Sequence, residues 1–227
     1  MKPTTIILIP GLLCDAAVWQ YQQPTLETIA PVIITNIHDA NTPTKMVAAI
    51  LKNAPTKFAL IGHSMGGWIA LEIMRKYSER VTHLCLLNTT AKLDSPEKAA
   101  AREHLIALAK QGQYDLLIEK LLKAFLYQQC YKEEIKAMLI RNIDNVIKQE
   151  HAMQQRTDCV PILKHITCPT LIIHSKQDAI FDETHATLLN QKISHSTFHV
   201  LNHCGHMSPI EAREKVTTLL GNFLIWQ

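Results

Sequence analysis

The feature that most constrains the fold of this chain is a strand–turn–helix pattern at residues 57–77. An aliphatic run at 57–61 leads directly into the turn sequence G-H-S-M-G-G, and residues 65–77 follow with helical periodicity. Such a sharp turn lifts the serine hydroxyl above a sheet, and the amide hydrogens that begin the helix stabilise negative charge beside it. The pattern therefore predicts that Ser64 is a nucleophile on an α/β scaffold.

Strand-like and helical segments alternate along most of the chain. Uninterrupted aliphatic runs are typical of strands that are buried on both faces. We expect strands at 6–9, 32–37, 57–61, 81–87, 169–174 and 197–201, and helices after Asp15, at 44–52, at 65–77 and at 208–226. This alternation predicts a mainly parallel sheet of about six strands with helices on both faces.

Residues 92–160 interrupt the alternation. They contain no convincing strand but three helical patterns, at 96–111, 113–126 and 132–156. They also hold 21 of the 43 charged residues, 11 basic and 10 acidic, which indicates helices with solvated faces. We therefore expect a helical cap at 92–160, inserted after the fourth strand between two parts of the core, 1–91 and 161–227.

A serine on such a turn needs an acid and then a histidine further along the chain. His206 follows the last expected strand and precedes the final helix, so we expect it to be the general base, with His203 as the alternative. Asp178 follows the fifth strand and would orient His206 by accepting a hydrogen bond from its ring. Asp182 and Asp94 are the alternatives for the acid, although Asp182 also suits the start of a helix.

The loop P-G-L-L at residues 10–13 follows the first strand. In this class of fold, that loop supplies one half of the oxyanion hole. We expect the backbone amides of Leu12 and Met65 to hold the oxyanion, each contributing around 3 kcal/mol to transition-state stabilisation. The alternative interpretation is an ordinary Pro-Gly turn.

Composition argues against several other classes of protein. The net charge of +3 is not concentrated in any basic cluster, so no nucleic-acid partner is expected, and no apolar run approaches the roughly 20 residues that span a bilayer. The apolar N-terminus after Lys2 also suits a short signal peptide, but the Pro-Gly pair at 10–11 interrupts it. The six cysteines show neither a C-x-x-C pair nor metal-ligand spacing with histidine, which favours reduced thiols, a cytoplasmic location and no metal.

These motifs resemble those of small bacterial α/β-hydrolases of the carboxylesterase and pimeloyl-carrier-protein methyl ester esterase kind. The resemblance rests on I-P-G-L-L-C-D (9–15), G-H-S-M-G-G (62–67), P-T-L-I-I-H-S-K-Q-D (169–178) and C-G-H-M-S-P-I-E (204–211). It implies the α/β-hydrolase fold, a Ser-His-Asp triad and no metal or organic cofactor. The chain departs from the family in two features, Pro-Gly instead of His-Gly at 10–11 and Ser175 in place of a glycine. Because the first expected strand starts at residue 6, we also expect no antiparallel hairpin before it.

The sequence thus predicts a serine esterase that cleaves a small carboxylic ester or thioester through an acyl-enzyme. The alternatives are an acyltransferase or a carbon–carbon bond hydrolase with the same triad, and a non-catalytic ligand-binding homologue. The expected partner is a small-molecule ester, with no membrane partner; oligomeric state and chain-length preference stay open. Apolar residues of the cap either line an acyl pocket or pack the cap onto the core: Leu105, Leu108, Leu117, Leu121, Leu122, Phe125 and Met138.

Overall fold

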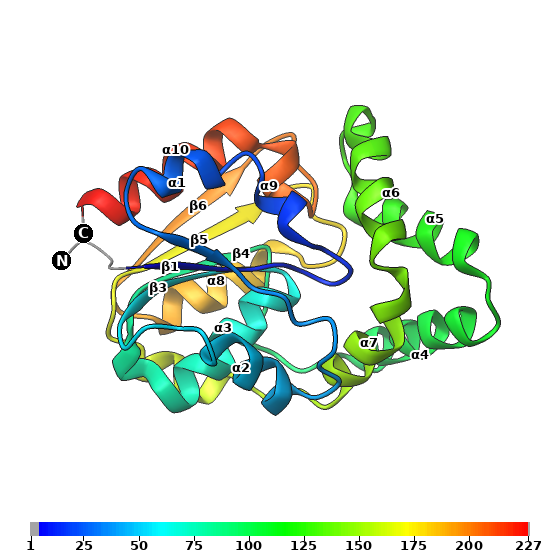
Figure 1. The fold of residues 1–227 in the computed structure, drawn as a ribbon, viewed down its shortest axis with the longest axis horizontal. Helices are drawn as coiled ribbons and strands as arrows, with labels where there is room; N and C mark the ends of the chain where they lie inside the picture. The colour runs from blue at the N-terminus through cyan, green and yellow to red at the C-terminus, as the bar shows by residue number, and fades with distance from the viewer. Residues whose placement is uncertain (1–4, 227) are drawn as a thin grey trace.

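The computed structural model describes residues 5–226; Lys2, which belongs to the signal-peptide interpretation, lies outside them. All six strands pair in parallel, in the order β2-β1-β3-β4-β5-β6 (Figure 1). The expected six-stranded sheet is thereby confirmed. The strands are β1 (Ile6–Ile9), β2 (Val32–Ile34), β3 (Phe58–His63), β4 (Val81–Leu87), β5 (Thr170–Ser175) and β6 (Ser196–Leu201).

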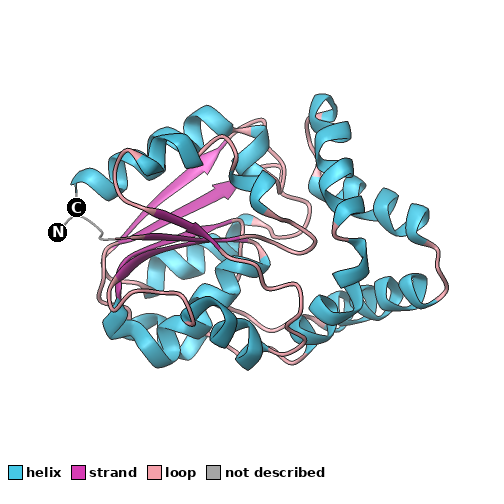
Figure 2. Cartoon of the chain, in the orientation of Figure 1, coloured by secondary structure: helices cyan, strands magenta, loops and turns pink. Residues whose placement is uncertain are grey.

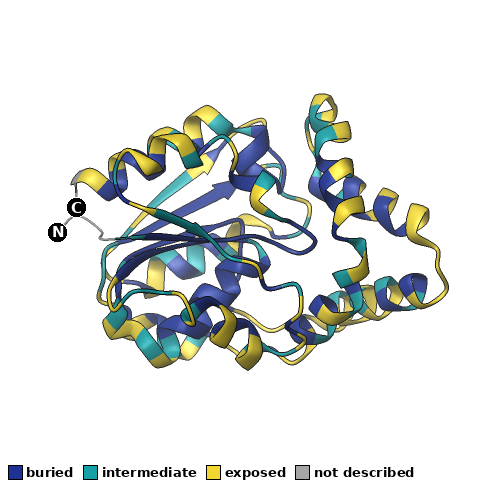
Figure 3. Ribbon diagram, viewed as in Figure 1, coloured by how far each residue is buried: buried dark blue, intermediate teal, exposed yellow. Residues whose placement is uncertain are grey.

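Helices cover both faces of the sheet, as the alternation predicts (Figure 2). One face carries α1 (Gln23–Glu27) and α10 (Arg213–Trp226), and the other carries α2 (Pro43–Leu51), α3 (Met65–Tyr77) and α8 (Glu183–Lys192). Because both faces are covered, β1, β3 and β5 are buried along their whole length (Figure 3). The central strands therefore form a rigid core whose carboxyl ends can hold side chains in fixed positions.

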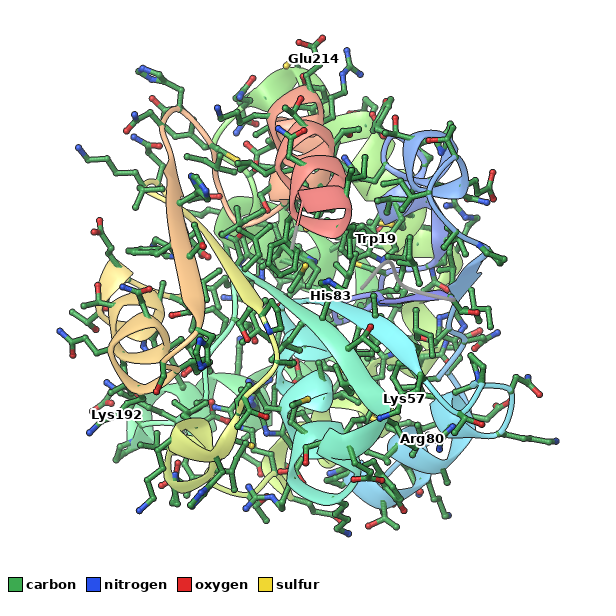
Figure 4. All side chains as sticks on the ribbon, turned by 90° about the vertical axis from the view of Figure 1, so that its left-hand side faces the viewer. Trp19, Lys57, Arg80, His83, Lys192 and Glu214 are labelled. Carbon is green, nitrogen blue, oxygen red and sulfur yellow. The ribbon has the colours of Figure 1, made fainter. Side chains whose placement is uncertain are left out.

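Between β4 and β5 the chain forms a group of helices, which we call the inserted segment (residues 92–160). Its helices are α4 (Pro96–Lys110), α5 (Tyr114–Phe125), α6 (Lys132–Arg141) and α7 (Val146–Gln154). The segment lies beyond the carboxyl ends of the strands (Figure 1), where parallel sheets bind ligands. Figure 4 views the opposite end of the molecule, where Lys57 and Arg80 immediately precede β3 and β4.

Two predicted helices are each broken into two. The predicted helix 132–156 is interrupted by the 3₁₀ turn η4 (Ile143–Asn145), and just before it the Asn142 side chain donates back to a carbonyl of its own helix and also to Asp15. The predicted helix 208–226 is interrupted at Ala212, whose φ of −123° is not helical, so that the short helix α9 (Ser208–Glu211) precedes α10. The contact of Asn142 with the distant Asp15, at the first of these breaks, is one that periodicity does not reveal.

The described residues include no helix with both the length and the hydropathy needed to cross a membrane. All six cysteines are free thiols, as their spacing predicts. Nor do residues 5–226 gather three or more His, Cys, Asp or Glu side chains into a group that could hold a metal ion.

Candidate active site

Ser64 stands in a strained turn between β3 and α3. Its φ of 54° is unfavourable for a residue with a side chain, so the surrounding contacts must hold the turn in place. A Cβ at Gly62 would lie 2.3 Å from Gly66 O, and a Cβ at Gly66 would lie 2.2 Å from Ile9 O. The backbone around Ser64 is packed so closely that both positions require glycine.

The structure brings Ser64, His206 and Asp178 into one hydrogen-bonded chain. His206 Nε2 lies 2.7 Å from Ser64 Oγ, and His206 Nδ1 lies 2.9 Å from Asp178 Oδ2. A carboxylate only accepts hydrogen bonds, so the ring proton is on Nδ1 and Nε2 is left to accept the serine proton. The three residues follow β3, β6 and β5, whose carboxyl ends lie at the same edge of the sheet.

Asp178 is held as a carboxylate by several donors. Burial opposes its ionisation, but the adjacent His206 and the hydrogen bonds from Asn88 Nδ2 (2.9 Å) and the Ile180 amide (2.8 Å) lower its pKa to about 2. Asn88 is positioned in turn by Ser208, whose hydroxyl donates to its side-chain oxygen. Sequence reasoning did not single out Asn88, although a polar residue directly after β4 is the signal that could have found it.

His63 packs beside the site as a neutral ring. It is fully buried, and its Nε2 donates to the backbone oxygen of His206 at 2.8 Å. Burial, followed by the proximity of His206, lowers the pKa of His63 to about 3. His63 is therefore uncharged at neutral pH and supports the loop that carries His206.

The alternative residues lie elsewhere. His203 is exposed, and Asp182 caps α8 by accepting a hydrogen bond from the Thr184 amide. Asp94 is paired with two arginines of the inserted segment. None of these three side chains has a hydrogen bond to Ser64 or to His206 in the described part of the chain.

Leu12 and Met65 line the cavity that contains Ser64. Among residues 5–226, neither backbone amide donates to an acceptor within the protein. Two backbone donors therefore stay available beside the serine hydroxyl, at the positions that the sequence predicts for an oxyanion hole.

A cavity of about 220 Å³ lies between the sheet edge and the inserted segment. Ser64 and His206 form part of its wall, and most of the remaining wall is apolar. Of the seven apolar residues considered as lining, Leu105, Leu121 and Phe125 do line it; the other four are buried within the inserted segment and pack it together: Leu108, Leu117, Leu122 and Met138.

The cavity wall also contains charged groups from α4 and α7. Arg102 pairs with Glu150 at 2.7 Å and with Asp94 at 2.6 Å, and Arg156 pairs with Asp94 at 2.6 Å. Lys98 also lines the cavity, and its Nζ lies 4.4 Å from the centre of the Phe181 ring. Within the described residues Lys98 has no ion-pair partner, and the cavity wall itself holds two cations, Lys98 and Arg102, and one carboxylate, Glu150.

The inserted segment is also attached to the loop that carries His206. The His206 amide donates to Phe125 O at 2.9 Å, and the Phe125 ring lies 5.3 Å from the imidazole. Glu211 accepts hydrogen bonds from the amides of Tyr127 and Gln128, just beyond α5. The C-terminal end of α5 is therefore fixed against the site.

The parallel sheet, the strained serine turn at its carboxyl edge and the helices inserted after β4 define an α/β hydrolase. Within this class, the chain belongs to the family described as "Serine aminopeptidase, S33", whose model matches residues 34–213. The expected class of protein is confirmed. The matched range includes Ser64, Asp178 and His206, and it begins after the loop that contains Leu12.

Comparison with known proteins gives several hydrolases. 2-Hydroxymuconate semialdehyde hydrolase of Pseudomonas putida is 28% identical over 181 residues, which cover 73% of this chain and 61% of that protein. The chain thus spans about three fifths of the length of such curated relatives. Among solved structures, a malate-bound thermophilic esterase from Thermogutta terrifontis is 25% identical with a TM-score of 0.87, covering 98% of this chain and 90% of that one. The enol-lactonase of Burkholderia xenovorans LB400 shares the fold at 20% identity and a TM-score of 0.85, covering 99% and 92%.

Proposed function

We propose that this hydrolase is a serine esterase that cleaves a small carboxylic ester through an acyl-enzyme. The observation that carries the proposal is the 2.7 Å contact between Ser64 Oγ and His206 Nε2. Because Asp178 binds the other ring nitrogen, Nε2 is free to accept the serine proton. A purely ligand-binding homologue has no need for this arrangement. The esterase among the similar structures, at 25% identity, supports the same activity.

In the proposed mechanism, His206 removes the Ser64 proton as the hydroxyl oxygen attacks the ester carbonyl. Asp178 stabilises the imidazolium that forms, since the carboxylate stays ionised in the folded protein. The amides of Leu12 and Met65 hold the oxyanion of the tetrahedral intermediate. The intermediate collapses as His206 returns the proton to the departing alcohol, and water then attacks the acyl-enzyme by the same steps.

The inserted segment acts in this proposal as a cap over an acyl pocket. Leu105, Leu121 and Phe125 supply apolar wall opposite Ser64, so the acyl group contributes binding energy through burial of its apolar surface. The proposed substrate is a small molecule. The free cysteines support a cytoplasmic location for the protein.

The test is steady-state hydrolysis of p-nitrophenyl esters from acetate to decanoate, with the wild type and Ser64→Ala measured side by side. We expect turnover that depends on Ser64 and an optimum at an intermediate chain length, where the apolar wall is filled. A rate that is flat or falls steadily with chain length would contradict the apolar acyl pocket. No turnover of any ester by folded wild-type protein would contradict the esterase assignment.

A second candidate is hydrolysis of a carbon–carbon bond in a substrate that carries a carboxylate. It is favoured by Lys98, the cation of the cavity wall without an ion-pair partner in the described residues, and by the hydrolase of 2-hydroxymuconate semialdehyde among the relatives. Measured under the same conditions, 2-hydroxymuconate semialdehyde should be consumed faster than any ester if this candidate is correct. Faster ester turnover favours the esterase.

A further inference from the structure

One buried hydrogen bond joins the inserted segment to the loop that carries the proposed oxyanion donor. The side-chain oxygen of Gln149, on α7, accepts from the backbone amide of Leu13 at 2.8 Å. Both residues are fully buried, and 136 positions separate them in the sequence. The amide orientation of Gln149 is settled by chemistry, because Leu13 N–H is a donor and only the oxygen can face it.

Leu13 needs this acceptor because of its backbone conformation. The loop forms a four-residue turn closed by the Cys14 amide on Gly11 O at 3.2 Å, and Leu13, in the third position, has a φ of 54°. Positive φ at that position is typical of glycine or asparagine, and a branched apolar residue adopts it only when other contacts impose it. The turn offers no acceptor of its own for the Leu13 amide, so the bond to Gln149 satisfies a buried donor and holds an unfavourable conformation.

Holding Leu13 also orients Leu12. The Leu12 carbonyl and the Leu13 N–H belong to one planar peptide group, so fixing that N–H fixes the plane on one side of Leu12. The amide of Leu12 belongs to the neighbouring peptide group, which is joined to that plane only through φ and ψ of Leu12, so the anchored peptide limits how far the Leu12 amide can move. Without the anchor, the strained turn is free to relax and the loop to shift, which would move the Leu12 N–H from the position in which it can donate to an oxyanion.

We propose that Gln149 is a positioning residue, which holds the oxyanion loop in its active conformation from the inserted segment. This inference rests on the proposed function, because the Leu12 amide that Gln149 supports is one of the two proposed oxyanion donors. The inserted segment then does more than cover the substrate: α7 must be docked for the oxyanion hole to be complete. The same loop has a second contact with the segment, between Asp15 and Asn142 Nδ2 at 2.9 Å.

The test compares three variants on the p-nitrophenyl ester that the wild type hydrolyses best. Gln149→Met keeps the length of the side chain and removes the acceptor, and Gln149→Glu keeps an acceptor oxygen. Lys148→Met is the matched control, because it is the preceding residue of α7 and loses a contact with Asp39 on the surface of the core. Thermal unfolding of each variant shows whether it is folded at the assay temperature.

We expect Gln149→Met to lower kcat about 10- to 100-fold, with KM changed less than about twofold, because a displaced donor weakens transition-state binding more than substrate binding. Inhibition by a trifluoromethyl ketone, which forms a tetrahedral adduct on the serine, should weaken by the same factor as kcat/KM. Gln149→Glu should recover most of the lost kcat, and Lys148→Met should match the wild type.

Wild-type kcat in folded Gln149→Met would overturn the inference, and so would a Gln149→Glu variant that is no more active than Gln149→Met. Lower activity that follows only the folded fraction, with unchanged ketone inhibition, would also overturn it. These outcomes leave the esterase proposal intact, because it fails only if the wild type itself shows no Ser64-dependent turnover.

Discussion

The two sides of the candidate site are built in different ways. On the sheet side, backbone geometry fixes the reacting groups: Ser64 is held in a strained turn by glycines with no room for a side chain, and Asp178 and His206 extend from strand ends. On the side of the inserted segment, long side chains from helices make the contacts, and several of them are charged and buried. The proposed function accordingly assigns the reaction to the core, and substrate choice and fine positioning to the inserted helices.

The largest effect should come from the core side. Replacing Asp178 with Asn should lower kcat about 10⁴-fold, because an amide can donate to His206 Nδ1 and favour the tautomer that presents a proton to Ser64. The measurement is kcat for the preferred ester, with circular dichroism to show that the variant is folded. A loss of less than tenfold would mean that Asp178 does not orient the base.

A different kind of loss is expected in the inserted segment. Arg102→Met leaves Glu150, which is fully buried, without its cation, and it also removes one partner of Asp94. Breaking such a buried pair typically costs about 3–5 kcal/mol of stability. Urea denaturation followed by both circular dichroism and Trp fluorescence should show this loss. Unchanged stability would show that the ion pairs do not hold α4 to α7, and would weaken the contrast between the two sides.

The sequence predicts the sheet side of the site better than it predicts the contacts of the inserted segment. The pattern of aliphatic runs located all six strands, and the turn motif together with chain order located the three residues that the structure brings together. β2 nevertheless ends at Ile34, before a turn in which the Asn36 side chain accepts a hydrogen bond from the His38 amide. Asn88 and Gln149 were not found, since their partners are determined by strand order and helix docking. No local pattern encodes either arrangement.

Acid should lower the free energy of unfolding through the buried His63 on the core side. The pKa of His63 is lowered from 6.5 to about 3 in the folded protein, so between these values the unfolded chain binds one proton more than the folded protein. Stability from this group is complete above pH 6.5 and is lost as the pH falls towards 3, by about 1.4 kcal/mol per pH unit. In His63→Gln, the unfolding free energy should fall less steeply with decreasing pH, by about 1.4 kcal/mol per pH unit. Part of the fall should remain, because the pKa of His185 is also lowered, to about 4. An unchanged slope in the variant would contradict the assignment to His63.

The smallest effect is expected at Lys98, where we expect a change in substrate choice alone. Lys98→Met should lower kcat/KM about fivefold for monoesters of dicarboxylic acids, in line with about 1 kcal/mol for a partly exposed ion pair, and should leave uncharged esters unchanged. The ratio of the two rates, measured for acyl groups of equal length, isolates the charge. Equal losses on both substrates would assign to Lys98 only a packing role against Phe181.

The central claim is that Ser64 is an activated nucleophile, and labelling with a fluorophosphonate tests it most directly. Wild-type protein, Ser64→Ala and His206→Ala are incubated with the probe near neutral pH, and the modified peptide is identified by mass spectrometry. The account predicts one adduct, on Ser64, in the wild type, with no adduct in Ser64→Ala and strongly slowed labelling in His206→Ala. Folded wild-type protein that fails to label, or that labels at another residue, would contradict it.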